Sequence, residues 1–342
     1  MTRHFAYRFV ATLGIILLSC VKGEAQEWTY QIEDLGFFDN REVHSPYQRS
    51  QTLFGTRLGA ETGLKRDSSS VMAGYYLIQE FGRGGLADHG WTLYYRYEGT
   101  RFSGAFGSFP RRLLQRELPD VFEDDSLRYY VPNRYGALLQ YYGTSGSAEL
   151  YCNWRGRQSY TEREIFEIVS DGEWFVPVDR QRLVVGYNAE LTHFSVRRGK
   201  TTDKVYDKVM LNPYLGFKAE CGGILLDSAF VQAGLLVSFN RDRMDKIWKT
   251  PCGLLADMHL HKGLWGIRNR LYVGGCQLND YEKYGRALHQ GDTYYRSGFY
   301  DRLDASVRLL HKEHVDCSVL ASFHFTEGTM DSSQLIRLNI IL

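Results

Sequence analysis

The chain alternates apolar and polar residues with a period of two along nearly its whole length. The segment WTLYYRYEG places Trp91, Leu93 and Tyr95 on one face and mainly polar residues on the other. The pattern recurs in AFVQAGLLVSF at 229–239 and in QLIRLNIIL at 334–342. Successive side chains of a β-strand point to opposite faces, so this period is typical of strands. The pattern therefore predicts an all-β protein.

The predicted strands are long, and their connections alternate between short and long. Many runs extend over about nine to eleven residues, the length that a tilted strand needs to cross a bilayer. The connections at 110–133, 196–204, 240–252 and 276–298 are long and polar, whereas the one at 98–101 is very short. Transmembrane barrels have short periplasmic turns and long extracellular loops. We therefore expect a single antiparallel transmembrane β-barrel. A secreted β-sandwich is the alternative, but it predicts shorter strands and more frequent turns.

The expected number of strands is about sixteen. Tracing back from the C-terminus gives fifteen strands, and EWTYQIEDLGFF at 27–38 supplies one more. Single-chain bacterial barrels have even strand numbers, so fourteen is the alternative, with 27–50 inside or below the barrel. The last strand must pair with the first because backbone polar groups cannot stay unpaired in lipid. Its outward face would be apolar, with Arg337 and Asn339 inside.

The first 25 residues are expected to be a secretory signal peptide. Two arginines precede an apolar run, and small residues come before a predicted cut between Ala25 and Gln26. A lipoprotein signal ending at Cys20 is the alternative, and the preceding leucine fits it poorly. The mature domain would be 26–342.

Composition narrows the possible partners. The chain has 41 basic and 40 acidic residues, and this balance argues against a nucleic-acid partner. Five of the six cysteines lie beyond the signal peptide, so they cannot all pair within one chain. Cys252 and Cys276 fall at the same end of a predicted hairpin, nearly opposite each other, which makes them a possible disulfide.

Several stretches together resemble a known group of proteins. They are FFDNREVHSPYQRSQTLFGTRLGAETG, YRYEGTRFSGAFGSFPRR, DSLRYYVPNRYG, NWRGRQSYTEREIFEI, FYDRLD and SVLASFHFTEG. They resemble a largely uncharacterised, porin-like family of outer-membrane β-barrels from anaerobic Gram-negative bacteria. The resemblance implies a place in the cell outer membrane, surrounded by outer-membrane lipid, and it implies no catalytic residue set. The apolar last strand resembles the signal read by the barrel-assembly machinery, which is therefore an expected partner.

The inward face is expected to carry charge. By alternation, the candidate lumen-lining arginines are Arg57, Arg96, Arg155, Arg268, Arg270, Arg308 and Arg337. Acids share this face, among them Glu61, Glu98, Glu149, Glu190, Asp257 and Asp316. Charged rings around water would set ion preference, whereas opposite charges on neighbouring strands would only fill a narrow lumen. The first hypothesis predicts a porin-like channel for small hydrophilic solutes or ions, with a weak anion preference.

The connection at 110–133 is the longest early loop. Its first half is basic and its second half acidic. In porins an early long loop often folds into the lumen and narrows it, an analogy of position alone. A plain surface loop is the alternative.

Other chemistry is sparse. His259 and His261 share a face with Asp257, but no third neutral metal ligand can be assigned. Ser322 and His324 also share a face, without an evident partner acid. We therefore expect no metal, no cofactor and no enzymatic activity. The alternatives to a channel are a non-conducting barrel with surface-binding loops and, less favoured, an outer-membrane enzyme.

Overall fold

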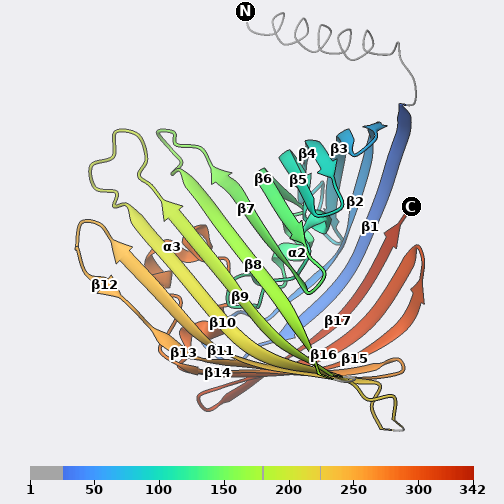
Figure 1. The fold of residues 1–342 in the computed structure, drawn as a ribbon. Coiled ribbons are helices and arrows are strands. Elements are labelled where there is room, and N and C mark those ends of the chain that lie inside the picture. Colours follow the sequence, from blue (N-terminus) through green and yellow to red (C-terminus); the bar gives the residue numbers. More distant parts are fainter. Residues whose placement is uncertain (1–25, 179–180, 224) are drawn as a thin grey trace, which may run out of the picture.

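Strands form the whole wall of the molecule (Figure 1). The computed structural model describes residues 26–178, 181–223 and 225–342. The wall strands, in chain order, are β1 (Glu27–Glu42), β2 (Gln51–Arg66), β3 (Ser69–Glu80), β4 (Asp88–Glu98), β5 (Phe102–Pro110), β6 (Asn133–Tyr142), β7 (Gly146–Gly156), β8 (Ile165–Val178), β9 (Gln181–Phe194), β10 (Tyr206–Glu220), β11 (Ser228–Asp242), β13 (Cys252–Lys262), β14 (Trp265–Gly274), β15 (Phe299–Lys312), β16 (Val315–Thr326) and β17 (Thr329–Ile341). The two-residue β12 (Trp248–Lys249) belongs to a loop and extends the edge of β11.

Pairing between the first and last strands closes the barrel. Each wall strand is antiparallel to its neighbours, and β1 pairs with β17 from Glu33↔Ile341 to Glu42↔Ser332. The predicted transmembrane barrel of sixteen strands is confirmed. The alternative of fourteen is wrong because the segment 27–42 forms a wall strand. Beyond the last residues that β1 shares with β17, residues 27–31 of β1 pair with β2 but not with β17.

Short and long connections lie at opposite ends of the barrel. Turns such as 67–68 and 313–314 lie at the end where β1 begins and β17 finishes, the periplasmic end. The long connections, including 157–164 and 195–205, lie at the extracellular end. At that end β16 and β17 are joined by two residues only, and Gly328 takes a positive φ of 79° there.

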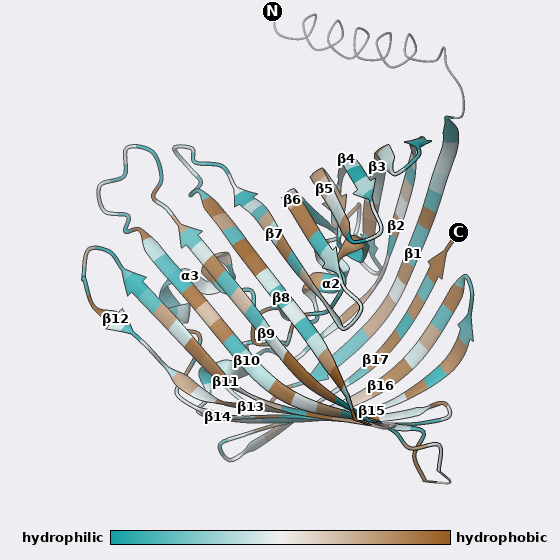
Figure 2. Cartoon of the chain, in the orientation of Figure 1, coloured by the Kyte–Doolittle hydropathy of each residue, from teal (hydrophilic) through white to brown (hydrophobic). Residues whose placement is uncertain are grey.

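Apolar side chains cover the outside of the wall, and polar side chains face the inside. Brown and teal residues alternate along the strands (Figure 2). Outward-facing Trp91 and Leu215 are 75% and 62% exposed. Inward-facing Asp171 and Arg302 are 1% and 4% exposed. Such an outer surface is stable only against hydrocarbon, and every strand that crosses it has its backbone paired.

Two extracellular connections fold back into the lumen. The first, 111–132, contains the 3-10 turn η1 (Arg111–Leu113) and α2 (Leu127–Tyr130). The second, 275–298, contains α3 (Tyr281–Leu288) and η2 (Thr293–Arg296). Two backbone hydrogen bonds join them: Asp124 donates to Gln290 and Asp292 donates to Asp120, both at 2.8 Å. The early loop therefore lies inside the barrel, as the porin analogy predicted.

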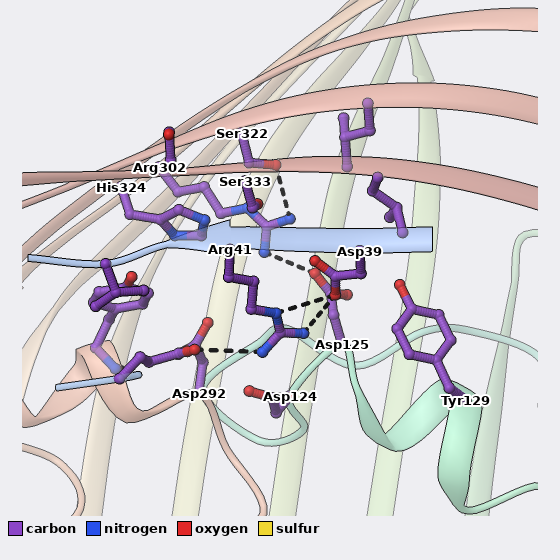
Figure 3. Close-up of a pocket in the computed structure, with 16 residues that line it drawn as sticks. Asp39, Arg41, Asp124, Asp125, Tyr129, Asp292, Arg302, Ser322, His324 and Ser333 are labelled. Atoms are coloured by element: carbon purple, nitrogen blue, oxygen red, sulfur yellow. Dashed lines mark hydrogen bonds and ion pairs between the residues drawn. The ribbon is translucent and has the colours of Figure 1, made fainter. Parts of the chain in front are cut away.

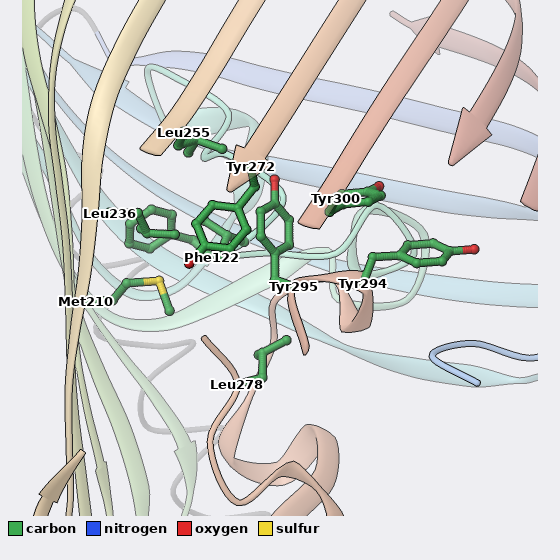
Figure 4. Close-up of a cluster of buried hydrophobic side chains, with 10 residues drawn as sticks. Phe122, Met210, Leu236, Leu255, Tyr272, Leu278, Tyr294, Tyr295 and Tyr300 are labelled. Atoms are coloured by element: carbon green, nitrogen blue, oxygen red, sulfur yellow. The ribbon is translucent and has the colours of Figure 1, made fainter. Parts of the chain in front are cut away.

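A hydrophobic cluster anchors these two loops to the inner wall (Figure 4). Its buried members are Val121, Phe122, Met210, Leu236, Leu255, Tyr272, Leu278, Tyr294, Tyr295 and Tyr300. They come from both loops and from β10, β11, β13, β14 and β15. Tyr294 stacks on Tyr300 with 5.0 Å between ring centroids. Apolar burial thus fixes both loops against the wall. None of the helices in the described residues is long and apolar enough to span a membrane.

Candidate functional site

All seven arginines predicted to line the lumen lie on inward-facing strand positions, and six of them are in ion pairs. These pairs are Arg57–Glu33 at 2.6 Å, Arg96–Glu98 at 2.7 Å, Arg155–Glu167 at 2.5 Å, Arg268–Asp257 at 2.5 Å, Arg270–Asp304 at 2.6 Å and Arg308–Asp316 at 3.3 Å. Arg337 has no ion pair within the described residues. Pairing across strands therefore accounts for most of the lumenal charge.

Arg302 is the centre of the largest lumenal network, and the sequence pattern did not single it out. Its guanidinium lies 2.9 Å from Asp120 and 2.8 Å from Asp125, both on the inserted loop. It also contacts Asp304 on its own strand at 2.7 Å. Arg270 contacts the same Asp120 from β14. Acids of the loop thus neutralise arginines of the wall, and the loop is held inside by charge as well as by apolar contact.

A second arginine network lies around Glu123, also on the inserted loop. The carboxylate accepts hydrogen bonds from Arg111 at 2.7 Å and from Arg134 of β6. Burial alone would raise the pKa of Glu123, but Arg134 and Arg111 outweigh it and lower the pKa to about 2. Arg134 is itself almost fully buried, so this carboxylate is the partner that compensates its charge.

Asp292, on the second inserted loop, lies among other acids. Burial raises its pKa to about 7, and the nearby Asp124 and Asp120 carboxylates add to this increase. Gln48, from the β1–β2 connection, donates to Asp292 at 2.7 Å. The contact between the two inserted loops therefore includes a carboxyl group that is costly to ionise.

Ser322 and His324 line a small cavity together with Asp124 and Asp292 (Figure 3). The cavity measures about 30 Å³, room for about one water molecule. His324 Nδ1 lies 2.8 Å from the Tyr300 hydroxyl, and Ser322 contacts Arg302 at 3.4 Å. Both side chains are buried. The two residues do share a site, but its volume leaves no room for more than a small molecule such as water.

The outer wall carries a second group of polar side chains, at the extracellular rim. Cross-strand pairs place Trp154, Phe166, His193, Asp207 and Arg241 in one row across β7 to β11. The neighbours of these residues on each strand face inward and are mostly buried, so the row faces outward. Trp154 stacks on Phe166, and Phe166 lies 5.1 Å from the His193 ring. Aromatic residues at this level are typical of the lipid–water interface.

His193 and Asp207 form a hydrogen-bonded pair within this row. His193 Nδ1 lies 2.7 Å from Asp207 Oδ1, and Arg243 holds both oxygens of Asp207 at 2.6 and 3.1 Å. The carboxylate fixes the orientation of the imidazole through Nδ1, and within the described residues Nε2 has no hydrogen-bond partner. Arg241 adds positive charge from β11, and its Nε is buried without a hydrogen-bond partner. This arrangement can accept a proton from a group in the outer leaflet.

The loops above this row are basic. The connections 157–164, 195–205 and 243–251 carry nine basic and four acidic side chains, a net charge of +5. The inserted connection 275–298, by contrast, carries three of each sign. The rim above β7–β11 therefore attracts anionic groups at the membrane surface.

Sequence reasoning missed this outer site because it depends on strand register. His193 is the next-to-last residue of β9 and Asp207 is the second residue of β10, and only the register that pairs them brings their side chains together. The signal available was two polar residues at outward positions near strand ends. In an outer face that is otherwise apolar, such residues are unusual.

The predicted disulfide and the histidine pair on β13 form no linked or metal-binding group within the described residues. Cys252 and Cys276 are both free thiols, so the predicted disulfide is not formed. Cys276 lies past the end of β14. The backbone carbonyl of Cys252 accepts a hydrogen bond from the Gly275 N–H instead. Within the described residues, no three acidic, histidine or cysteine side chains, His259 and His261 included, are grouped to hold a metal. The predicted signal peptide falls on residues 1–25, outside the described part.

The closed sixteen-stranded wall, apolar outside and polar inside, defines an outer-membrane β-barrel of porin-like fold. OprD of Pseudomonas aeruginosa, an outer membrane protein, has a similar structure, with a TM-score of 0.52, 11% identity, and 94% of this chain and 95% of that one covered. A loop-deletion mutant of OmpT, an outer membrane protein of Vibrio cholerae, is also similar, with a TM-score of 0.54 and 8% identity. The match covers 93% of this chain and 100% of that one. The predicted location in the outer membrane is confirmed.

The chain belongs to the lipid A 3'-O-deacylase-type family, whose model matches residues 21–341. Comparison with curated proteins gives no match. The prediction that the protein is not an enzyme is wrong, because this family is described by an enzymatic activity. The porin-like resemblance holds for the barrel fold. The barrel-assembly machinery stays a predicted partner.

Replacing Glu123 by glutamine is expected to lower the free energy of unfolding by about 3–5 kcal/mol, because buried Arg134 would lose its counter-charge. Urea titration of the protein folded in lipid vesicles measures this. Glu117→Gln is the matched control, since Glu117 is 65% exposed and its pair with Arg128 contributes about 1 kcal/mol or less. Equal effects of the two variants would contradict the assignment.

The contact between the inserted loops is expected to weaken as pH rises through about 7. The pKa of Asp292 is raised in the folded state, so its stabilising contribution is complete below the unfolded pKa and is lost as the buried carboxyl ionises. Hydrogen exchange of the Asp124 and Asp292 amides, at about pH 6 and about pH 8 and corrected for intrinsic rates, measures this. Asp292→Asn should abolish the difference between the two pH values. An unchanged difference in that variant would refute the role of Asp292.

Proposed function

We propose that this protein is an outer-membrane hydrolase that cleaves an ester-linked acyl chain from lipid A, with His193 as general base. The observation that carries the proposal is the outward-facing His193–Asp207 pair at the extracellular rim. The family to which the chain belongs supports the substrate class.

The position of the pair suits a lipid substrate. Lipid A lies in the outer leaflet, so its ester bonds can reach the outer wall without entering the barrel. The Ser322–His324 cavity is a poor alternative because it holds about one water molecule. Trp154 and Phe166, beside His193, offer an apolar surface against which an acyl chain can pack.

The proposed chemistry needs a base, a water molecule and a positive charge. His193 Nε2 takes a proton from water as the water oxygen attacks the ester carbonyl, and Asp207 stabilises the resulting imidazolium. Arg241 supplies positive charge for the oxygen that becomes negative in the tetrahedral intermediate. The carbon–oxygen ester bond then breaks, the sugar oxygen receives the proton from His193, and the fatty acid leaves.

The basic loops complete the proposed substrate site. Lipid A carries phosphate groups at the membrane surface, directly outside the ester bonds. The +5 charge of the connections above β7–β11 would hold those phosphates, and Arg243 is 54% exposed on that side. Binding the phosphates would bring the esters to the level of His193.

The test is fatty-acid release from lipid A in vesicles containing the purified protein, measured by mass spectrometry. His193→Gln is expected to lower the rate by about 100-fold or more, the usual contribution of a general base. His89→Gln is the matched control: His89 also faces outward near the extracellular rim, where it bonds Tyr75 at 2.5 Å. Full activity in His193→Gln, or no release by the wild-type protein, would sink the proposal.

Passage of small hydrophilic solutes with a weak anion preference is a second candidate function. It is favoured by a cavity of about 290 Å³ on the periplasmic side of the inserted loops, lined by six arginines. Planar-bilayer recordings are expected to give small conductance steps whose reversal potential follows the anion gradient. The absence of such steps, or reversal that follows the cation, would count against it.

A further inference from the structure

We infer that this same lumenal cavity is a binding site for a small organic anion that also carries hydroxyl groups. The cavity lies between the inserted loop, from Arg111 to Leu118, and the inner faces of β1, β2 and β17. It lies in the periplasmic half of the barrel, whereas His193 lies on the outer wall at the extracellular rim. The inference is independent of the proposed hydrolase activity.

The lining side chains carry an excess of positive charge. The arginines are Arg57, Arg111, Arg112, Arg116, Arg128 and Arg337, and the acids are Glu33, Glu117 and Glu123. The first five arginines are paired with acids of the wall or the loop. Arg337 alone has no ion pair among the described residues. The nearby Asp125 is already paired with Arg302 and Arg128, so a guanidinium in this partly buried cavity favours a further anion beside it.

Two further side chains in the lining have unsatisfied polar atoms. Both amide atoms of Gln115 and the side-chain oxygen of Asn339 are buried without a hydrogen-bond partner. Gln115 is fixed in position, because its backbone N–H donates to Glu149 at 2.9 Å. Buried polar groups of this kind normally have partners, and a ligand in the cavity would supply them once these two lining side chains turn toward it.

The chemistry of these groups defines the ligand class. Arg337 and the Gln115 amide nitrogen donate, so they suit carboxylate or phosphate oxygens. The Asn339 oxygen and the Gln115 oxygen accept, so they suit hydroxyl groups. A volume of about 290 Å³ admits a molecule of the size of a sugar acid or a sugar phosphate. Neutral sugars lack the negative charge that would pair with Arg337.

Calorimetry on the full-length barrel in detergent tests the site, with gluconate and glycerol 3-phosphate as probes and glucose as the neutral control. At least one anion is expected to bind more tightly than glucose, and the one that binds identifies carboxylate or phosphate as the preferred group. Arg337→Gln should weaken that binding at least about tenfold, as expected for one charge-assisted contact. Binding of neither anion above glucose would overturn the inference.

Matched variants separate loss of the site from loss of the fold. Arg268→Gln removes another inward-facing arginine, which pairs with Asp257 outside the cavity, and should bind the anion like the wild type. Asn339→Leu leaves the charges intact and should weaken binding through the lost hydroxyl partner. Heat-dependent migration on gels verifies that each variant is a folded barrel. Wild-type affinity in Arg337→Gln, or equal losses in Arg337→Gln and Arg268→Gln, would refute the assignment.

Discussion

Every feature of this protein depends on one constraint: backbone N–H and C=O groups cannot remain unpaired in hydrocarbon. The sheet satisfies it by pairing β1 with β17, so the wall has no free edge across the membrane. Closure divides the side chains into an outer set in contact with lipid and an inner set shielded from it. The two candidate sites belong to different sets, and this separation lets one barrel carry a lipid-directed site and a lumenal site without either obstructing the other.

The inner set explains why a barrel of this width is not simply open. Apolar residues of the inserted loops pack against tyrosines of the wall, and loop acids pair with wall arginines such as Arg302 and Arg270. Desolvation of these charges is costly, so each must have its partner in place. The lumen therefore contains separate cavities of different character. The one around Ser322 and His324 has room for about one water molecule, whereas the one beside Arg337 is large enough for a ligand.

Local pattern was enough to predict the wall, and it was not enough to predict the sites. Alternation in segments such as 229–239 indicated strands, their length indicated a membrane, and the need for closure indicated a sixteenth strand. The pairs that matter arise from contacts distant in sequence: Arg302 meets Asp120 across 182 residues. His193 meets Asp207 only through the register of β9 on β10. No spacing rule reports such contacts, and for that reason enzymatic activity was wrongly excluded.

The overhang of β1 fixes how deeply the barrel sits in the bilayer. Residues 27–31 pair with β2 on one side only, so their other backbone groups require water. The inner boundary of the hydrocarbon layer must therefore lie on the extracellular side of this segment. Trp28 and Tyr30, which are strongly exposed on it, then fall among the phospholipid head groups of the inner leaflet. An unpaired stretch of strand thus acts as a depth marker for the entire molecule.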